Sequence, residues 1–122
     1  MIAAMRNPHV TAIAHPTGRL LSGREGYAVD IESVAEAAAE FGVALELNAC
    51  VDRLDLDENN LRRAVARGGR ISIGSDSHHS GDMDMIRFGI GIARRAWLTK
   101  EHVLNTRPWK NLHGRREQGP SR

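Results

Sequence analysis

The amino-acid sequence predicts an α/β fold in which short parallel strands alternate with helices. Three apolar segments with strand character, residues 9–14, 43–48 and 70–75, are each followed by a stretch with helical periodicity. Such alternation is typical of a parallel sheet with right-handed crossovers. The 122 residues have the length of one small domain.

The first strand is expected over residues 9–14, and Pro16 ends it because proline cannot continue a regular ladder. A loop rich in glycine and arginine follows over residues 17–26. Asp30 is a candidate N-cap and Gly42 a candidate C-cap of the first helix. The apolar face of that helix consists of Ile31, Val34, Ala35, Ala38 and Phe41.

The second strand, residues 43–48, leads through a polar loop to Asp57, the expected N-cap of the second helix. Leu61, Ala64 and Val65 form its apolar stripe, and a Gly-Gly pair at 68–69 stops it before the third strand.

A third helix is expected from Met83 to Trp97, with Ile86, Ile90, Ala93 and Trp97 on its inner face. Trp97 and Trp109 are interpreted as packing residues. Thr99 can cap a short helix over residues 100–104, and residues 108–112 can add one turn. Residues 114–122 have no apolar periodicity and are predicted to form a disordered basic tail.

Polar side chains stand where each predicted strand ends. The first strand ends at His15, the second carries Glu46 and Asn48, and the third runs into Asp76 and His78. Side chains at i and i+2 of extended chain point the same way, and parallel α/β sheets bind ligands at the carboxyl ends of their strands. The alternative is a polar turn in which Asp76 caps the next helix and His78 is solvated. Glu46 is interpreted as a structural partner rather than a ligand.

Composition excludes several classes of protein. No apolar run approaches the roughly 20 residues of a membrane span. Cys50 is the only cysteine, so no internal disulfide forms, which fits a reducing cytoplasm. The formal charge of +2 is concentrated toward the C-terminal tail and says little about the folded part.

Several motifs resemble the PHP (polymerase and histidinol phosphatase) domain, in particular the one at the C-terminus of bacterial family X DNA polymerases. They are the segments Ala-His-Pro-Thr-Gly-Arg-Leu-Leu at 14–21, Ala-Leu-Glu-Leu-Asn-Ala at 44–49, Arg-Leu-Asp-Leu at 53–56, Ser-Asp-Ser-His at 75–78, the glycine-containing helix at 85–95 and Val-Leu-Asn-Thr at 103–106. They cover nearly everything from residue 9 to residue 112 in the order expected for the family.

The resemblance implies a distorted seven-stranded β/α barrel that holds up to three divalent metal ions and hydrolyses phosphoesters. In the polymerase setting it implies 3′-5′ exonuclease activity on DNA 3′ ends. The family's last metal ligands map onto His15, Asp76 and His78, of which Asp76 and His78 are the expected catalytic pair. Histidine nitrogen and aspartate oxygen suit Zn²⁺, Mn²⁺ or Fe²⁺.

The family's earlier ligands, which include a His-x-His motif, have no counterpart in the sequence. Residues 1–113 are therefore expected to form a partial PHP domain, inactive alone and weak in metal binding. Three strands cut from a barrel would leave open edges and an uncovered apolar inner face. We therefore expect self-association or pairing with a missing N-terminal half.

Arg19 and Arg53 lie in loops past strand ends, where arginine can bind phosphate in bidentate fashion, and Asn48 can orient a substrate. The alternatives are surface ion pairs for the arginines and a strand-end hydrogen bond for Asn48. Two other functions stay open. One is a small-molecule phosphatase of the histidinol-phosphate type, and the other is a non-catalytic half-domain that binds DNA or a partner.

Overall fold

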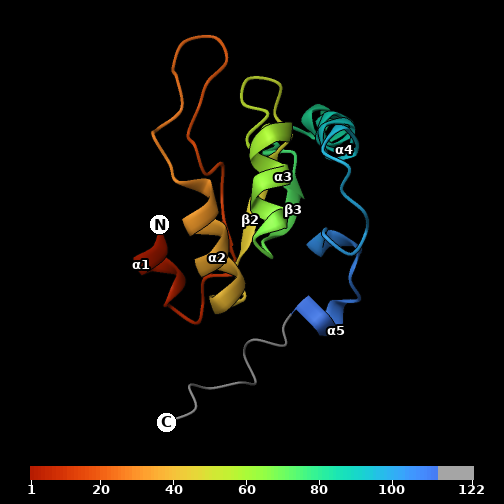
Figure 1. The fold of residues 1–122 in the computed structure, drawn as a ribbon. Helices are drawn as coiled ribbons and strands as arrows, with labels where there is room; N and C mark the ends of the chain where they lie inside the picture. Colours follow the sequence, from red (N-terminus) through yellow and green to blue (C-terminus); the bar gives the residue numbers. More distant parts are fainter. Residues whose placement is uncertain (113–122) are drawn as a thin grey trace.

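The computed structural model describes residues 1–112 as an α/β fold built on a three-stranded sheet (Figure 1). The strands β1 (Ala12–Ile13), β2 (Ala44–Asn48) and β3 (Arg70–Gly74) run parallel in the order β1-β2-β3. Helices connect them, so the predicted alternation is confirmed. Three strands do not define a seven-stranded barrel, which stays a proposal, and the predicted tail at 114–122 lies outside the described residues.

β1 is much shorter than the strand predicted over residues 9–14. A turn occupies its expected start, where the N–H of Val10 donates to the carbonyl of Asn7 at 3.1 Å. Pro8 inside this turn has no N–H to give to a ladder. After Ile13 the backbone leaves the strand region, since His15 has a φ of 28°.

The first two connecting helices begin and end as predicted. α2 (Ile31–Phe41) is capped by Asp30, whose carboxylate accepts the N–H of Ser33 at 3.2 Å, and it ends at Gly42 with a φ of 65°. α3 (Glu58–Ala66) is capped in the same way by Asp57. A further short helix, α1 (Ile2–Met5), was not predicted and packs on α2.

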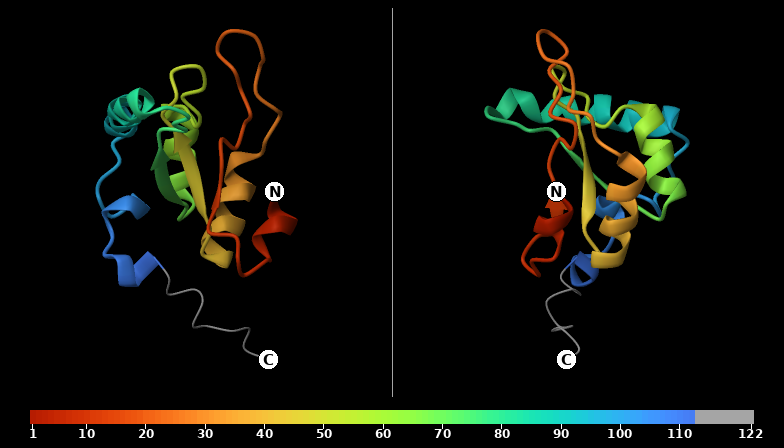
Figure 2. Two further views of the ribbon diagram at one scale, coloured as in Figure 1. Left: turned by 180° about the vertical axis from the view of Figure 1, so that it is seen from behind. Right: turned by 60° about the vertical axis from the view of Figure 1, so that its left-hand side comes forward.

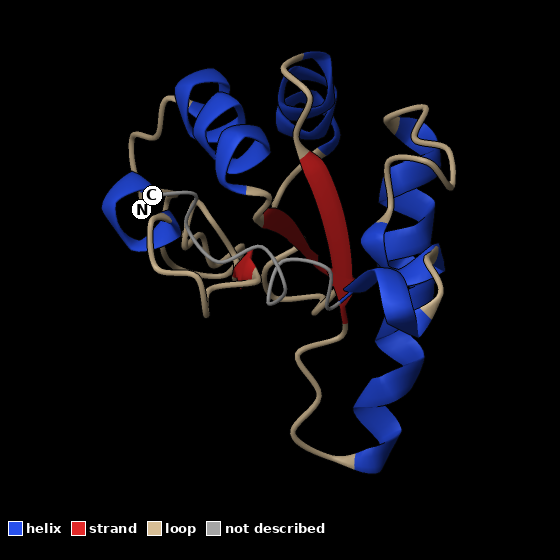
Figure 3. Ribbon diagram, turned by 90° about the horizontal axis from the view of Figure 1, so that it is seen from below, coloured by secondary structure: helices blue, strands red, loops and turns tan. Residues whose placement is uncertain are grey.

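The two faces of the sheet differ in chemistry. Leu45, Leu47 and Ile71 are fully buried in the core beneath α2 and α3, which lie on one side of the strands (Figure 2, right; Figure 3). On the opposite face Glu46 pairs in register with Ser72. The expectation of an apolar inner face is therefore wrong, because the period-two alternation of β2 and β3 places polar or small side chains on that face.

The outer edge of β3 is covered by a later segment of the chain. The N–H of Ile71 donates to the carbonyl of His102 at 2.9 Å. The side-chain amide of Asn105 accepts from the N–H of Ile73 at 2.8 Å and donates to its carbonyl at 2.9 Å. This edge is thus closed at two places without a neighbouring strand, in contrast to the predicted open edge.

The helix predicted over residues 83–97 is two elements. A 3₁₀ helix, η1 (Ser80–Met85), precedes α4 (Ile86–Arg95). The short helix predicted over residues 100–104 is wrong, since a turn leads instead to the 3₁₀ helix η2 (Leu104–Thr106). The last predicted turn is present as α5 (Trp109–Leu112).

The inner face of α4 also differs from the prediction. Gly89, Ala93 and Ala96 are buried, whereas Ile90 is 42 % and Trp97 is 77 % exposed. Trp109 is exposed as well, so neither tryptophan is a core residue. The small residues face inward because α4 lies close to the sheet: a Cβ on Gly89 would come within 2.8 Å of a neighbouring side chain.

Within the described residues no helix is long and apolar enough to cross a membrane.

Candidate functional site

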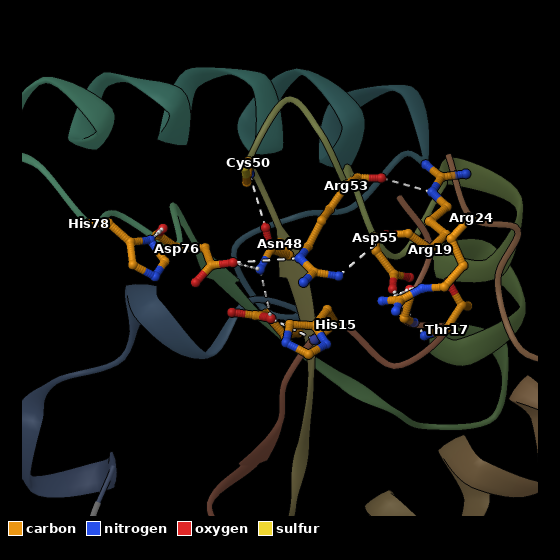
Figure 4. A network of polar contacts seen from close by, with 12 residues as sticks. His15, Thr17, Arg19, Arg24, Asn48, Cys50, Arg53, Asp55, Asp76 and His78 are labelled. Atoms are coloured by element: carbon orange, nitrogen blue, oxygen red, sulfur yellow. Dashed lines mark hydrogen bonds and ion pairs between the residues drawn. The ribbon is translucent and has the colours of Figure 1, made fainter. Parts of the chain in front are cut away.

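A chain of hydrogen bonds joins the carboxyl ends of the three strands (Figure 4). The backbone N–H of His15, just after β1, donates to Oε2 of Glu46 on β2 at 2.6 Å. The amide of Asn48 donates to the same carboxylate at 3.3 Å and to Oδ2 of Asp76, beyond β3, at 3.1 Å. The prediction that polar groups at the strand ends share one rim is thus confirmed.

Glu46 fits this rim because its neighbour on β3 has no side chain. Gly74 lies beside Glu46, and a Cβ there would stand 2.8 Å from Oε1 of that carboxylate. Glu46 is therefore a structural partner, as predicted. Asn48 is almost fully buried, and its Oδ1 accepts the N–H of Cys50 at 3.0 Å. The amide orientation follows from these partners, since only Nδ2 can donate to two carboxylates.

Two of the predicted ligands stand on strained backbone. His15 has a φ of 28° and Asp76 a φ of 55°, values that non-glycine residues rarely adopt. Such conformations cost on the order of 1–3 kcal/mol each and persist only where surrounding structure holds them. The hydrogen bond that His15 donates to Glu46 and the one that Asp76 accepts from Asn48 supply part of that support.

The two predicted phosphate-binding arginines have different surroundings. Arg53 places Nε 3.6 Å from Oδ2 of Asp76, so it stands at the rim. Arg19 donates to the carbonyls of Arg53 and Leu54 and pairs with Asp57 at 3.5 Å. Arg19 thus ties two loops together, and its role toward phosphate stays a prediction.

Asp55 is a site residue whose burial no helix or strand pattern in the sequence indicates. Its carboxylate is fully buried, and Oδ2 accepts the N–H groups of Thr17 and Gly18, each at 3.0 Å. These bonds fix the turn that follows His15. Asp55 lies in an irregular loop, where no apolar period distinguishes a buried carboxylate from an exposed one.

His78 has a defined tautomer in this geometry. Its Nδ1 lies 2.8 Å from the carbonyl of Asp76, and a carbonyl only accepts, so Nδ1 carries a proton and Nε2 is the nitrogen left for another partner. The same turn is tied by Asp82. The N–H of His78, and then that of His79, donate to its carboxylate and hold the pKa of Asp82 below its ordinary value.

The described residues do not by themselves form a metal centre. Within residues 1–112 no three His, Cys, Asp or Glu side chains are grouped so that they can share an ion. Asp76 faces Asn48 and Arg53, while His15 is bound at the rim through its backbone N–H. The ligand prediction for His15, Asp76 and His78 therefore stays a prediction.

The chain is similar to bacterial proteins that are named as a DNA polymerase/3′-5′ exonuclease and as probable phosphatases. The chain is 41 % identical over 109 residues to the DNA polymerase/3′-5′ exonuclease PolX of Bacillus subtilis. This alignment covers 89 % of the chain and 19 % of PolX. It is 34 % identical over 112 residues to a probable phosphatase of Thermoanaerobacter sp., covering 87 % and 43 % respectively. For a probable phosphatase of Proteus mirabilis the identity is 33 % over 128 residues, covering 96 % and 50 %.

The chain thus spans half or less of the length of each of these relatives. No protein-family profile matches it. Each of these alignments takes in at least 87 % of the chain, and therefore most of the stretch that carries the strand-end motifs. The resemblance stated from those motifs is therefore confirmed: the chain is related to part of the PHP domain of bacterial family X DNA polymerase/3′-5′ exonucleases.

Proposed function

We propose that this chain contributes the strand-end rim of a PHP-type phosphoesterase site. The observation that carries the proposal is the hydrogen-bonded connection of His15, Glu46, Asn48 and Asp76 across three neighbouring strands. Parallel sheets bind their ligands at this end, and strained backbone gathers at functional sites. The names of the relatives agree with this chemistry.

The proposed ligands for a divalent ion are His15, Asp76 and His78. Nitrogen and carboxylate oxygen suit Zn²⁺, Mn²⁺ or Fe²⁺, and such ions activate water and stabilise charge on a phosphoester. Because the described residues do not group three ligands, the site needs side chains from outside residues 1–112, in a further segment or a partner that pairs with this chain. The geometry of His78 suits a metal ligand, since its Nδ1–H bonds to the carbonyl of Asp76 and leaves Nε2 available to an ion.

Arg53 is the proposed phosphate-binding residue. It lies beside Asp76 and is only one-fifth exposed, so its guanidinium is held at the rim. It can exchange its contact with Asp76 for the phosphate of a substrate, to which arginine donates two parallel hydrogen bonds. The substrate that we propose is the 3′ end of DNA, as the name of the Bacillus subtilis relative indicates, and we propose a cytoplasmic location because Cys50 is the only cysteine.

Two other functions have support of their own. The relatives named probable phosphatases favour a small phosphoester as substrate. The absence of a three-ligand group within residues 1–112 favours a non-catalytic chain that binds DNA or a partner.

The test compares the chain with Asp76→Asn and His78→Gln, and uses His9→Gln as a matched control at a histidine remote from the rim. Hydrolysis of a 3′-labelled single-stranded oligonucleotide and of p-nitrophenyl phosphate is measured with excess Mn²⁺, and Zn²⁺ binding by calorimetry. Weak metal binding that is lost in both rim variants and kept in the control supports the proposal.

Each other outcome contradicts a defined part of it. Binding unchanged in both rim variants removes Asp76 and His78 as ligands. Sub-micromolar stoichiometric binding contradicts the expected weakness of the chain alone. Hydrolysis of p-nitrophenyl phosphate without oligonucleotide cleavage favours the small-molecule phosphatase, and the absence of both metal binding and hydrolysis favours the non-catalytic function.

A further inference from the structure

α4 presents an outer face that nothing else in the described chain covers. This face consists of Arg87, Ile90, Gly91 and Arg94, all of which are exposed. Residues three, four and seven apart share one side of a helix, so the four side chains form a continuous stripe. Trp97 follows one turn beyond Arg94 and is 77 % exposed.

The outer face of α4 is basic. The sequence has no carboxylate between Met85 and Lys100, while three arginines lie in α4 itself. Arg95 pairs with Glu58 at 2.5 Å, whereas Arg87 and Arg94 form no ion pair within the described residues. The guanidinium of Arg87 lies 4.9 Å from the centre of the Phe88 ring, and both Arg87 and Arg94 are exposed, so a polyanion in solvent can reach them.

Two glycines in α4 differ in what their surroundings require. Gly89 faces the sheet, where a Cβ would come within 2.8 Å of Ala49 and of Ile73. Gly91 faces outward, and a Cβ there would meet nothing within 4 Å. A glycine inside a helix lowers its stability relative to alanine, and nothing in the described chain explains this one. Close approach of an external backbone would explain it.

Trp97 is held in an unusual way. Its φ is 59°, a left-handed conformation that a bulky residue rarely adopts, and the indole is nevertheless largely exposed. The guanidinium of Arg62 lies 4.5 Å from the centre of the ring, which orients it. An exposed, oriented aromatic ring beside an arginine is an arrangement on which single-stranded nucleic acids stack their bases.

We propose that the outer face of α4 binds single-stranded nucleic acid, with phosphates at Arg87 and Arg94, the strand passing over Gly91, and a base on Trp97. The inference rests on the proposed function, which takes the 3′ end of DNA as the substrate, and it adds a surface outside the rim that holds the strand. α4 packs on Ala49 and Ile73, at the carboxyl ends of β2 and β3, so a strand on this face lies beside the rim (Figure 2).

The test measures binding of a fluorescein-labelled oligothymidylate of about 12 nucleotides to the full chain by anisotropy, at about 50 mM salt and above. Gly91→Ala is the sharpest variant, because it should raise the melting temperature while it weakens binding at least fivefold. Arg87→Gln with Arg94→Gln should weaken binding roughly tenfold and lower the salt slope by about 1.4. Trp97→Ala should also weaken it roughly tenfold, and Trp97→Phe should restore most of the loss.

Arg6→Gln, at the end of α1, removes the same charge beyond the β1 edge of the sheet, at the opposite end from α4 (Figure 1), and should leave binding unchanged. Binding that is equal in wild type, Gly91→Ala and the double arginine variant would overturn the inference, as would no binding at low salt. Weak binding of Zn²⁺, measured by calorimetry, and its loss in Asp76→Asn test the rim separately. Failure of the α4 surface therefore leaves the proposed phosphoesterase site standing, and the reverse also holds.

Discussion

Asp55→Ala tests how the turn carrying His15 is held. The substitution removes the acceptor of two buried N–H groups, those of Thr17 and Gly18, both bonded at 3.0 Å. A hydrogen bond to a charged group contributes about 1.5–3 kcal/mol, and an unsatisfied buried donor adds to the loss. Against this, Oδ1 of Asp55 has no partner in the described chain, so burying the carboxylate is itself unfavourable. We expect a net loss of about 3 kcal/mol.

The assay is urea unfolding followed by circular dichroism. Asp55→Asn keeps one acceptor oxygen without the charge, and we expect it to lose only about 1 kcal/mol. Asp52→Ala is the matched control, because Asp52 is exposed in the same loop and its side chain makes no hydrogen bond or ion pair within the described residues; its effect should stay within about 0.5 kcal/mol. An Asp55→Ala protein as stable as the Asp52→Ala control would refute the assigned role of the buried carboxylate.

Three further predictions concern the elements around the rim. Gly89→Ala should destabilise the chain by about 1–2 kcal/mol, because its Cβ would lie 2.8 Å from two side chains and the gain in helix propensity does not offset that overlap. Thermal melting of Gly89→Ala and Gly91→Ala measures this difference, and equal melting temperatures for the two variants would contradict the prediction. Asn105→Ala should expose the edge of β3 and promote self-association, visible in sedimentation velocity, whereas an unchanged monomer fraction would show that the amide is not what protects Ile73. The pKa of Asp82 is lowered in the folded chain. The stabilisation that its carboxylate gives is therefore present above the unfolded-state pKa and is lost as the pH falls through the lower folded-state pKa. An NMR titration should show the turn loosening only at acidic pH, and Asp82→Asn should show no such pH-dependent change.

The sequence predicted much of the local structure correctly. Asp30 and Asp57 cap α2 and α3 as expected, because an aspartate before an apolar stripe satisfies the free N–H groups of the first turn whatever packs around it. The predicted rim is also present, since strand direction alone places the carboxyl ends of parallel strands at one edge.

The sequence-based predictions were wrong where packing between elements overrides the apolar periodicity of a single element. In α4 the spacing favoured Ile90 and Trp97 as inner residues, but the distance between helix and sheet selects Gly89 and Ala93 instead. The burial of Asp55 and the cover that Asn105 gives to β3 involve residues more than thirty positions apart in sequence, and no local pattern indicates such contacts.

By itself, the sequence determined which residue types meet at the strand ends and to which proteins the chain is related. Both follow from local order along the chain: apolar period, caps and motifs. Only the tertiary structure decided that the partners of Asp76 within the chain are Asn48 and Arg53, and which side chains of α4 face outward. These outcomes depend on how closely distant segments approach one another, which close packing sets and the order of residues along one segment does not.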